Sequence, residues 1–243
     1  MPENKSTSKK ISTGIKGMDN ALMGGIPEGN QLLLAGGPGV GKTLTSFEIL
    51  YHAAKANIPC SMVMFEEQQD SALRNIKSTF SEMDGIDGLI STKMLQIEGE
   101  ESASKIFGNT NAENYTFGDF VSDIEDIIKL NKSRILVIDS ISFIKFMVHN
   151  HGAYRRSLIS MLANMRRMGV TSIMTSEMQT YDRSALRYTQ DFFLFDGIIT
   201  MYQLGEEHER LLAMEIIKMR GANHSRALIP YDITPSGIKM SDI

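Results

Sequence analysis

The sequence predicts an α/β protein with a mainly parallel central sheet flanked by helices and an antiparallel β-hairpin extension near the C-terminus. Most of the predicted strands are continuous apolar runs rather than alternating ones, which is typical of strands covered on both faces. Segments with apolar residues three and four positions apart follow several of these runs, and this spacing predicts helices. The last quarter of the chain has no such segment between its β-like runs, so hairpins are expected there.

The elements are expected in the following order along the chain. A turn-rich segment over 12–30 leads into the first core strand, and residues 85–118 are expected to be mostly loop. The expected core strands are 31–35, 61–65, 94–97, 135–139 and 170–176, and the expected helices are 44–57, 73–83, 120–128 and 158–168. The β-like segments of the last quarter are 198–204, 211–219, 227–233 and 238–240.

Composition narrows the class of protein. The 243 residues are 42% hydrophobic, so we expect one domain over 12–243 after a flexible N-terminus over 1–11. The net charge of −4 provides no overall basic field to hold nucleic acid. Cys60 is the only cysteine, which excludes an internal disulfide and a cysteine-based zinc site. The polar start and the lack of long apolar runs predict a cytoplasmic protein without a membrane span.

The stretch 36–43 reads GGPGVGKT and matches the phosphate-binding pattern G-x-x-x-x-G-K-[ST]. It lies between a predicted buried strand and a predicted helix, which is the context that the pattern requires. Its glycines let consecutive backbone N–H groups point into one concavity, and its lysine, also a catalytic candidate, adds a positive charge beside the phosphates. The expected nucleotide ligands here are Gly37, Pro38, Gly39, Val40, Gly41, Lys42, Thr43 and Leu44.

Asp139 ends the apolar run 135–138, where a carboxylate could hold Mg²⁺ beside the hydroxyl of Thr43. The alternative is that Asp139 caps the turn that continues through Ser140 and Ser142. Because a phosphate-binding loop lies upstream, we favour the metal role for Thr43 and Asp139.

Glu66 and Glu67 follow the predicted strand 61–65, a place where packing poorly explains two adjacent carboxylates. One of them could polarise a water for attack on a γ-phosphate. Phosphoryl transfer needs such a base or water-positioning group in addition to the loop, the lysine and the metal. The alternative is a helix start, since acidic residues stabilise the positive end of a helix dipole. Glu67 suits that role better, so Glu66 is the principal catalytic candidate and Glu67 the second.

Lys218 and Arg220 close a β-like segment, and their spacing places two cations on one face of a strand. They could be solvated charges at a strand edge. They could also form a finger that reaches the γ-phosphate in a neighbouring subunit, because cations near the transition state supply much of the rate. The pattern alone leaves both interpretations open.

Together these motifs resemble the RecA-like P-loop ATPases, and among them the single-domain KaiC-like proteins of the archaeal type. The resemblance covers nearly the whole chain, with specific matches at 12–15, 24–29, 36–43, 65–67, 137–140, 196–199 and 218–224. It implies ATP or ADP with Mg²⁺, held between the subunits of a homo-oligomer, a hexameric ring. It also implies that Lys218 and Arg220 contact the neighbour's nucleotide, which Ser78, Met219, Ala222, His224 and Thr234 help to line.

One departure from the family pattern concerns autophosphorylation. In the clock protein of this family, a Ser/Thr pair is phosphorylated, and the matching residues here are Phe192 and Phe193. Neither side chain has a hydroxyl, so autokinase activity is not favoured. Thr180, Ser184 and Thr189 are the nearby residues that could accept a phosphate instead.

Three functions compete on this basis. The favoured one is a Mg²⁺-dependent, ATP-hydrolysing oligomer that acts as a regulatory switch on an unidentified protein partner. The second is a DNA-binding recombinase or recombination regulator, since 178–190 contains Tyr181, Arg183, Arg187 and Tyr188, a composition suited to single strands. The third is a nucleotide-gated scaffold with little hydrolysis, against which Glu66, Glu67 and Asp139 argue.

Overall fold

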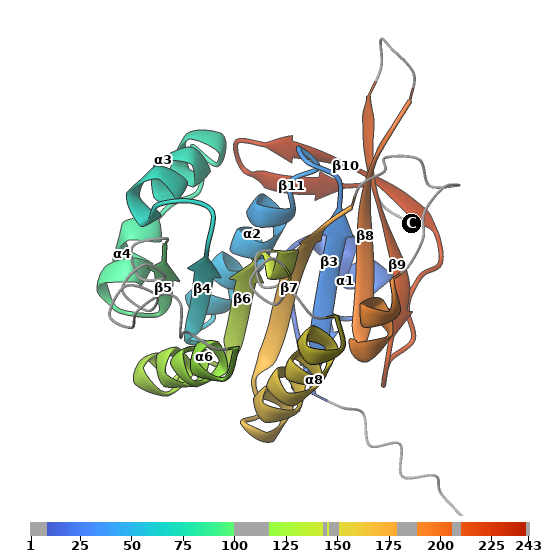
Figure 1. Ribbon diagram of the computed structural model, residues 1–243. Coiled ribbons are helices and arrows are strands. Elements are labelled where there is room, and N and C mark those ends of the chain that lie inside the picture. The colour runs from blue at the N-terminus through green and yellow to red at the C-terminus, as the bar shows by residue number, and fades with distance from the viewer. Residues whose placement is uncertain are drawn as a thin grey trace, which may run out of the picture.

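A nine-stranded sheet forms the centre of the molecule, and helices cover both of its faces (Figure 1). The computed structural model describes residues 9–99, 117–142, 145, 151–178, 189–205 and 210–241. A separate two-stranded sheet joins β1 (Lys10–Ile11) to β2 (Ile26–Pro27). Among the helices within those ranges, none has the length and apolar character needed to cross a membrane.

Six strands form the parallel part of the sheet: β3 (Gln31–Gly36), β4 (Cys60–Met64), β5 (Leu95–Glu98), β6 (Ile135–Asp139), β7 (Thr171–Glu177) and β8 (Gly197–Leu204). They lie in the order β8-β3-β7-β6-β4-β5, and each neighbouring pair is parallel. The predicted mainly parallel sheet is therefore confirmed, and the carboxyl ends of these strands meet at one edge.

Three further strands extend the sheet beyond β8: β9 (Leu211–Met219), β10 (Leu228–Thr234) and β11 (Gly237–Met240). All three pairings are antiparallel, which confirms the predicted C-terminal hairpins. Met219 lies opposite Gly197, the first residue of β8. The end of β9 therefore lies at the edge where the parallel strands begin, and the end of β10 lies at the opposite edge.

The helices form two layers. One core packs α1 (Lys16–Ala21), α2 (Lys42–Lys55), α3 (Gln69–Thr79) and α4 (Ile86–Ser91) on one face of the sheet, and a second core packs α6 (Phe117–Asn131) and α8 (His151–Arg167) on the other. Figure 1 shows α6 and α8 in front of the sheet and α2 behind it. In β3, Leu32 and Leu34 belong to the first core, whereas Leu33 and Ala35 belong to the second. Both faces are buried, which explains the continuous apolar runs.

The structure contains short elements that were not expected. In the segment 85–118, expected to be mostly loop with one short strand, residues 86–91 form α4 and 95–98 form β5, while 100–116 lie outside the described residues. The turn-rich segment 12–30 contains α1 and β2. The expected flexible N-terminus reached residue 11, whereas Lys10 and Ile11 pair with β2. Helices α1 and α4 have six residues each, fewer than two turns, so apolar periodicity does not reveal them.

Cys60 begins β4 and is buried, and its Sγ donates to the carbonyl of Ile58 at 2.9 Å. Burial raises the pKa of the Cys60 thiol to about 12, because the thiolate would lose its hydration. We expect iodoacetamide at about pH 8 to leave Cys60 unmodified in the native protein and to alkylate it in urea. Intact mass after timed alkylation measures this, and rapid labelling without urea would contradict the buried position.

Candidate active site

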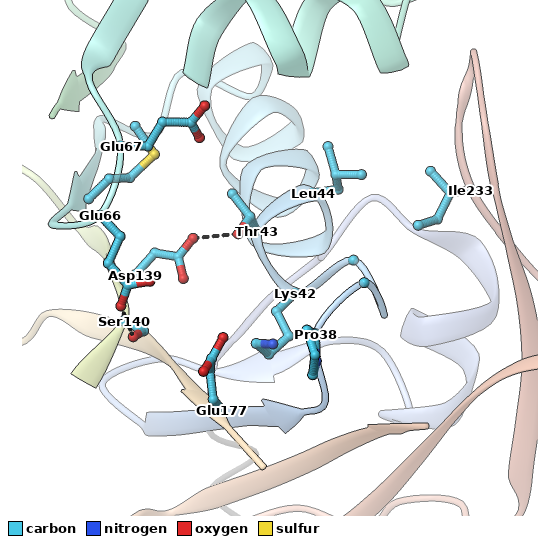
Figure 2. Close-up of a pocket in the computed structure, with 13 residues that line it drawn as sticks. Pro38, Lys42, Thr43, Leu44, Glu66, Glu67, Asp139, Ser140, Glu177 and Ile233 are labelled. Carbon is cyan, nitrogen blue, oxygen red and sulfur yellow. Dashed lines mark hydrogen bonds between the residues drawn. The ribbon is translucent and has the colours of Figure 1, made fainter. Parts of the chain in front are cut away.

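A cavity of about 590 Å³ opens at the edge where the parallel strands end. Figure 2 shows its lining, which comes from the loop after β3 and the start of α2, from the carboxyl ends of β4, β6 and β7, from the residues directly after β4 and β6, and from β10. The lining residues are Pro38, Gly39, Gly41, Lys42, Thr43, Leu44, Met64, Glu66, Glu67, Asp139, Ser140, Glu177 and Ile233. The cavity thus brings together three groups that the sequence predicted separately: the glycine-rich loop, the Glu66–Glu67 pair and Asp139.

The glycine-rich loop ends at the N-terminus of α2. Gly41 precedes the helix with φ 85°, a left-handed conformation that favours glycine, and as the N-cap residue it has no side chain that could cap the first turn. The first N–H groups of a helix have no partner within the helix, so this end is suited to bind an anion. Two predicted ligands, Gly37 and Val40, are not among the lining residues, and the side chain of Val40 is fully buried.

Lys42 folds back over the loop, with its Nζ donating to the carbonyls of Gly36 at 3.1 Å and Gly37 at 2.9 Å. Burial lowers the pKa of Lys42 below its ordinary value, while nearby carboxylates, that of Glu177 foremost, oppose this shift. The ammonium therefore lies between the loop and the acidic side of the cavity, where it could meet a phosphate.

Thr43 and Asp139 lie in direct contact across the cavity. The hydroxyl of Thr43 donates to Oδ2 of Asp139 at 2.6 Å (Figure 2). The hydroxyl of Thr175 donates to the other carboxylate oxygen. Within the described residues, no three His, Cys, Asp or Glu side chains form a group able to hold a metal ion. One carboxylate and one hydroxyl still fit Mg²⁺, which binds proteins through one or two carboxylates and keeps waters and substrate phosphates as its other ligands.

Glu66 and Glu67 both line the cavity but have different partners. Glu66 accepts a hydrogen bond from the hydroxyl of Ser140 at 3.1 Å. Glu67 accepts from Ser71 Oγ at 3.0 Å and from Asn75 Nδ2 at 2.6 Å, both on α3. The carboxylate of Glu67 thus forms hydrogen bonds with side chains of α3, which agrees with the alternative role at a helix start. Glu66 remains the better placed group to hold a water.

Glu177 is a cavity residue that was not predicted from the sequence. It ends β7, and Figure 2 shows its carboxylate beside the ammonium of Lys42. Its signal in the sequence is the same as that of Asp139: an acidic residue at the carboxyl end of a buried parallel strand. Four carboxylates, those of Glu66, Glu67, Asp139 and Glu177, therefore face one ammonium in this cavity.

The predicted cations Lys218 and Arg220 lie at the opposite edge of the sheet. Lys218 is in β9 opposite Ile198, near the beginning of β8, and Arg220 follows β9. The neighbouring strand β3 has six residues, which at about 3.3 Å per residue separates the two edges by about 20 Å. Neither cation can reach the cavity of its own chain.

Arg220 and a third cation, Arg166, bind the carboxylate of Asp196, and Lys218 binds backbone carbonyls nearby. Arg166 Nε donates to Asp196 Oδ2 at 3.0 Å, and Arg220 Nη1 donates to Oδ1 at 3.3 Å. Lys218 donates from its Nζ to the carbonyls of Phe193 and Phe195, and burial together with Arg220 lowers its pKa. Arg220 and Arg166 are both exposed, so this cluster of three cations and one carboxylate presents net positive charge at the surface.

The other nucleotide-lining candidates from the family resemblance lie in two places, some near the cavity and some near Arg220 at the opposite edge of the sheet. Thr234 follows the cavity residue Ile233, and Ser78 is exposed on α3 outside the lining. Ala222 and His224 follow Arg220 in the turn between β9 and β10, both partly exposed. The side chain of Met219 is buried beside Gly197, so a nucleotide contact from this residue would have to come from its backbone.

Two other predictions depend on residues outside the described ranges. Residues 179–188 of the candidate DNA-contacting loop, among them Thr180, Tyr181, Arg183, Ser184, Arg187 and Tyr188, are not described. Thr189 is described and directly precedes the short helix η3 (Gln190–Leu194). Phe193 in that helix is exposed and lacks a hydroxyl, so it cannot accept a phosphate.

Comparison with known proteins gave consistent matches. A family model described as the ATPase KaiC matches residues 11–243. The circadian clock oscillator protein KaiC of Rippkaea orientalis is 28% identical over 96% of this chain and 44% of its own length, and that of Synechococcus elongatus is 26% identical over 98% and 46%. The chain therefore spans less than half the length of these relatives. The crystal structure of a KaiC-like protein from Pyrococcus horikoshii matches with a TM-score of 0.80 at 27% identity, covering 96% of this chain and 99% of that one.

Proposed function

The chain belongs to the KaiC family of RecA-like P-loop ATPases, and from this premise we propose that it hydrolyses Mg²⁺–ATP as a homo-oligomer. Each nucleotide would lie between two copies of the chain. One copy would supply the loop, Mg²⁺ ligands and Glu66, and its neighbour would supply Lys218 and Arg220. The observation that supports this most strongly is that the two sets of residues lie at opposite edges of one sheet.

The charges of the two edges also support sharing of the site. Four carboxylates and one ammonium line the cavity, an arrangement that repels the phosphates of ATP. Mg²⁺ and the neighbour's cations would supply the missing positive charge. The Asp196 cluster of Lys218, Arg220 and Arg166 is complementary in sign, and complementary edges favour head-to-tail contact.

In the proposed reaction, the loop amides and Lys42 hold the β- and γ-phosphates, and Glu66 holds a water in line with the γ-phosphorus. The water oxygen forms a bond to the phosphorus as the bond to the β–γ bridging oxygen breaks, and the water's proton passes to the Glu66 carboxylate. ADP and inorganic phosphate are the products. Mg²⁺, when held by Thr43 and Asp139, would neutralise charge on the phosphate oxygens. Lys218 and Arg220 of the neighbour would stabilise the charge on the transferring group.

Head-to-tail contacts of one kind generate a closed ring when the rotation between copies closes. We propose a hexameric, cytoplasmic ring in which hydrolysis switches the contact between neighbours. The hexameric state follows the family resemblance. Because each nucleotide would lie between two subunits, its hydrolysis would change the contact between them directly. A DNA-binding function gains no support from the described residues, because the loop proposed for it lies mostly outside them.

The direct test is release of inorganic phosphate from Mg²⁺–ATP. Lys42→Ala removes the ammonium beside the loop and is expected to lower the rate by about 100-fold or more, the typical loss for one preorganised charge donor. Lys55→Ala is the matched control, because Lys55 is exposed at the far end of the same helix, and it is expected to hydrolyse ATP like the wild type. Tight ATP binding by the wild type without phosphate release would instead support a nucleotide-gated scaffold.

A further inference from the structure

The phosphate-binding loop has a support outside its own motif, the hairpin β10–β11. Figure 1 shows this hairpin beside α2, the helix that follows the loop. The buried carboxylate of Glu48 in α2 accepts from the backbone N–H of Ile238 at 2.7 Å and lies 3.5 Å from His52 Nε2. At the tip of the hairpin, the carbonyl of Pro235 accepts from the N–H of Glu82 at 3.0 Å. The hairpin is thus anchored at two separate points.

Two residues of β10 contact consecutive residues of the loop. Tyr231 is 2% exposed, and its hydroxyl donates to the backbone carbonyl of Val40. Ile233 lines the cavity, and its Cδ1 lies 2.6 Å from the point that a Cβ on Gly41 would occupy. The strand therefore packs against the loop where it turns into α2.

The Val40 carbonyl and the Gly41 N–H belong to one peptide group. A trans peptide group is planar and rigid, and its carbonyl and N–H point in opposite directions. A hydrogen bond that fixes the Val40 carbonyl on the hairpin side therefore also fixes the direction of the Gly41 N–H. Gly41 itself lines the cavity and directly precedes the first turn of α2.

We propose that Tyr231 is a positioning residue for nucleotide binding: its hydroxyl holds the Val40–Gly41 peptide so that the Gly41 N–H faces the bound phosphates. This inference rests on the proposed nucleotide site. Tyr231 does not itself touch the nucleotide, and its effect passes through the loop backbone. Without the hydroxyl, the Val40 carbonyl would be buried without its partner and the loop would gain other conformations.

The test compares two buried tyrosines that differ in what their hydroxyls hold. Tyr231→Phe keeps the buried ring and removes only the bond to the loop. Tyr202→Phe is the matched control, because Tyr202 is 3% exposed in β8 and its hydroxyl donates to Glu215 Oε2 at 3.3 Å, away from the loop. Thermal unfolding checks that both variants fold. We expect Tyr231→Phe to bind Mg²⁺–ADP about tenfold more weakly than wild type, and Tyr202→Phe to bind within about twofold.

Hydrogen–deuterium exchange tests the same contact without any nucleotide. Tyr231→Phe is expected to speed exchange in a peptide covering 37–43 relative to wild type, while Tyr202→Phe is expected to leave that peptide unchanged. Equal affinity and equal loop exchange in the two variants would overturn the positioning role. If wild type fails to bind nucleotide while Tyr231→Phe still loosens the loop, the proposed function fails and the support of the loop by Tyr231 stands.

Discussion

Replacing Arg220 with alanine is expected to lower the maximal rate of ATP hydrolysis by about 1,000-fold or more, the usual effect of losing a cation that contacts the transferring phosphoryl group. The fold should persist, because Asp196 keeps its bonds to Arg166 and to the N–H of Gln31. Steady-state phosphate release at saturating Mg²⁺–ATP measures the loss. The affinity for ADP should fall much less, since the cation acts on charge that develops during transfer.

The matched control for this change is Arg226→Ala. Arg226 is exposed in the same turn between β9 and β10 and has no assigned role, so its loss removes a nearby charge of the same kind. We expect this variant to keep the wild-type rate. If Arg220→Ala also kept it, with assembly intact, the contribution of the neighbouring subunit would be wrong.

Glu66→Gln is expected to lower kcat by about 100- to 10,000-fold, the range that general base catalysis contributes, with little change in ATP affinity. Glutamine retains the oxygen that accepts from the hydroxyl of Ser140, so the local structure should be kept while the proton acceptor is lost. Single-turnover hydrolysis separates this loss of chemistry from slow product release.

Glu67→Gln provides the comparison, because it changes the adjacent carboxylate in the same cavity. Glu67 already accepts hydrogen bonds from Ser71 and Asn75. We therefore expect the fold-reduction of kcat in Glu67→Gln to be at least ten times smaller than in Glu66→Gln. A larger loss for Glu67→Gln would mean that the two carboxylates have the opposite roles.

Much of the cavity was predictable because its parts lie in short, continuous segments. The loop motif, Glu66 and Asp139 each follow a buried apolar run, and the carboxyl ends of parallel strands meet at one edge. Glu177 follows the same rule and could have been found by it. The predicted parallel sheet and C-terminal hairpins were confirmed for the same reason, since strand type depends on local apolar pattern.

The rest depends on register and on contacts between distant segments, which a single sequence does not reveal. Only the pairing of Met219 with Gly197 places Lys218 and Arg220 at the far edge of the sheet. The link from Tyr231 to Val40 spans 191 positions. The burial of the Met219 side chain beside Gly197 likewise depends on the pairing of β8 with β9.

The most direct test of a site shared between copies is to mix two inactive variants. Lys42→Ala disables the loop half of its own site, and Arg220→Ala disables the half offered to a neighbour. In mixed assemblies, an intact loop will lie next to an intact Arg220, so phosphate release is expected to rise well above that of either variant alone. Subunit exchange is verified in parallel by native mass spectrometry. Recovery of activity on mixing is the predicted result, and an inactive mixture with proven exchange would contradict the account.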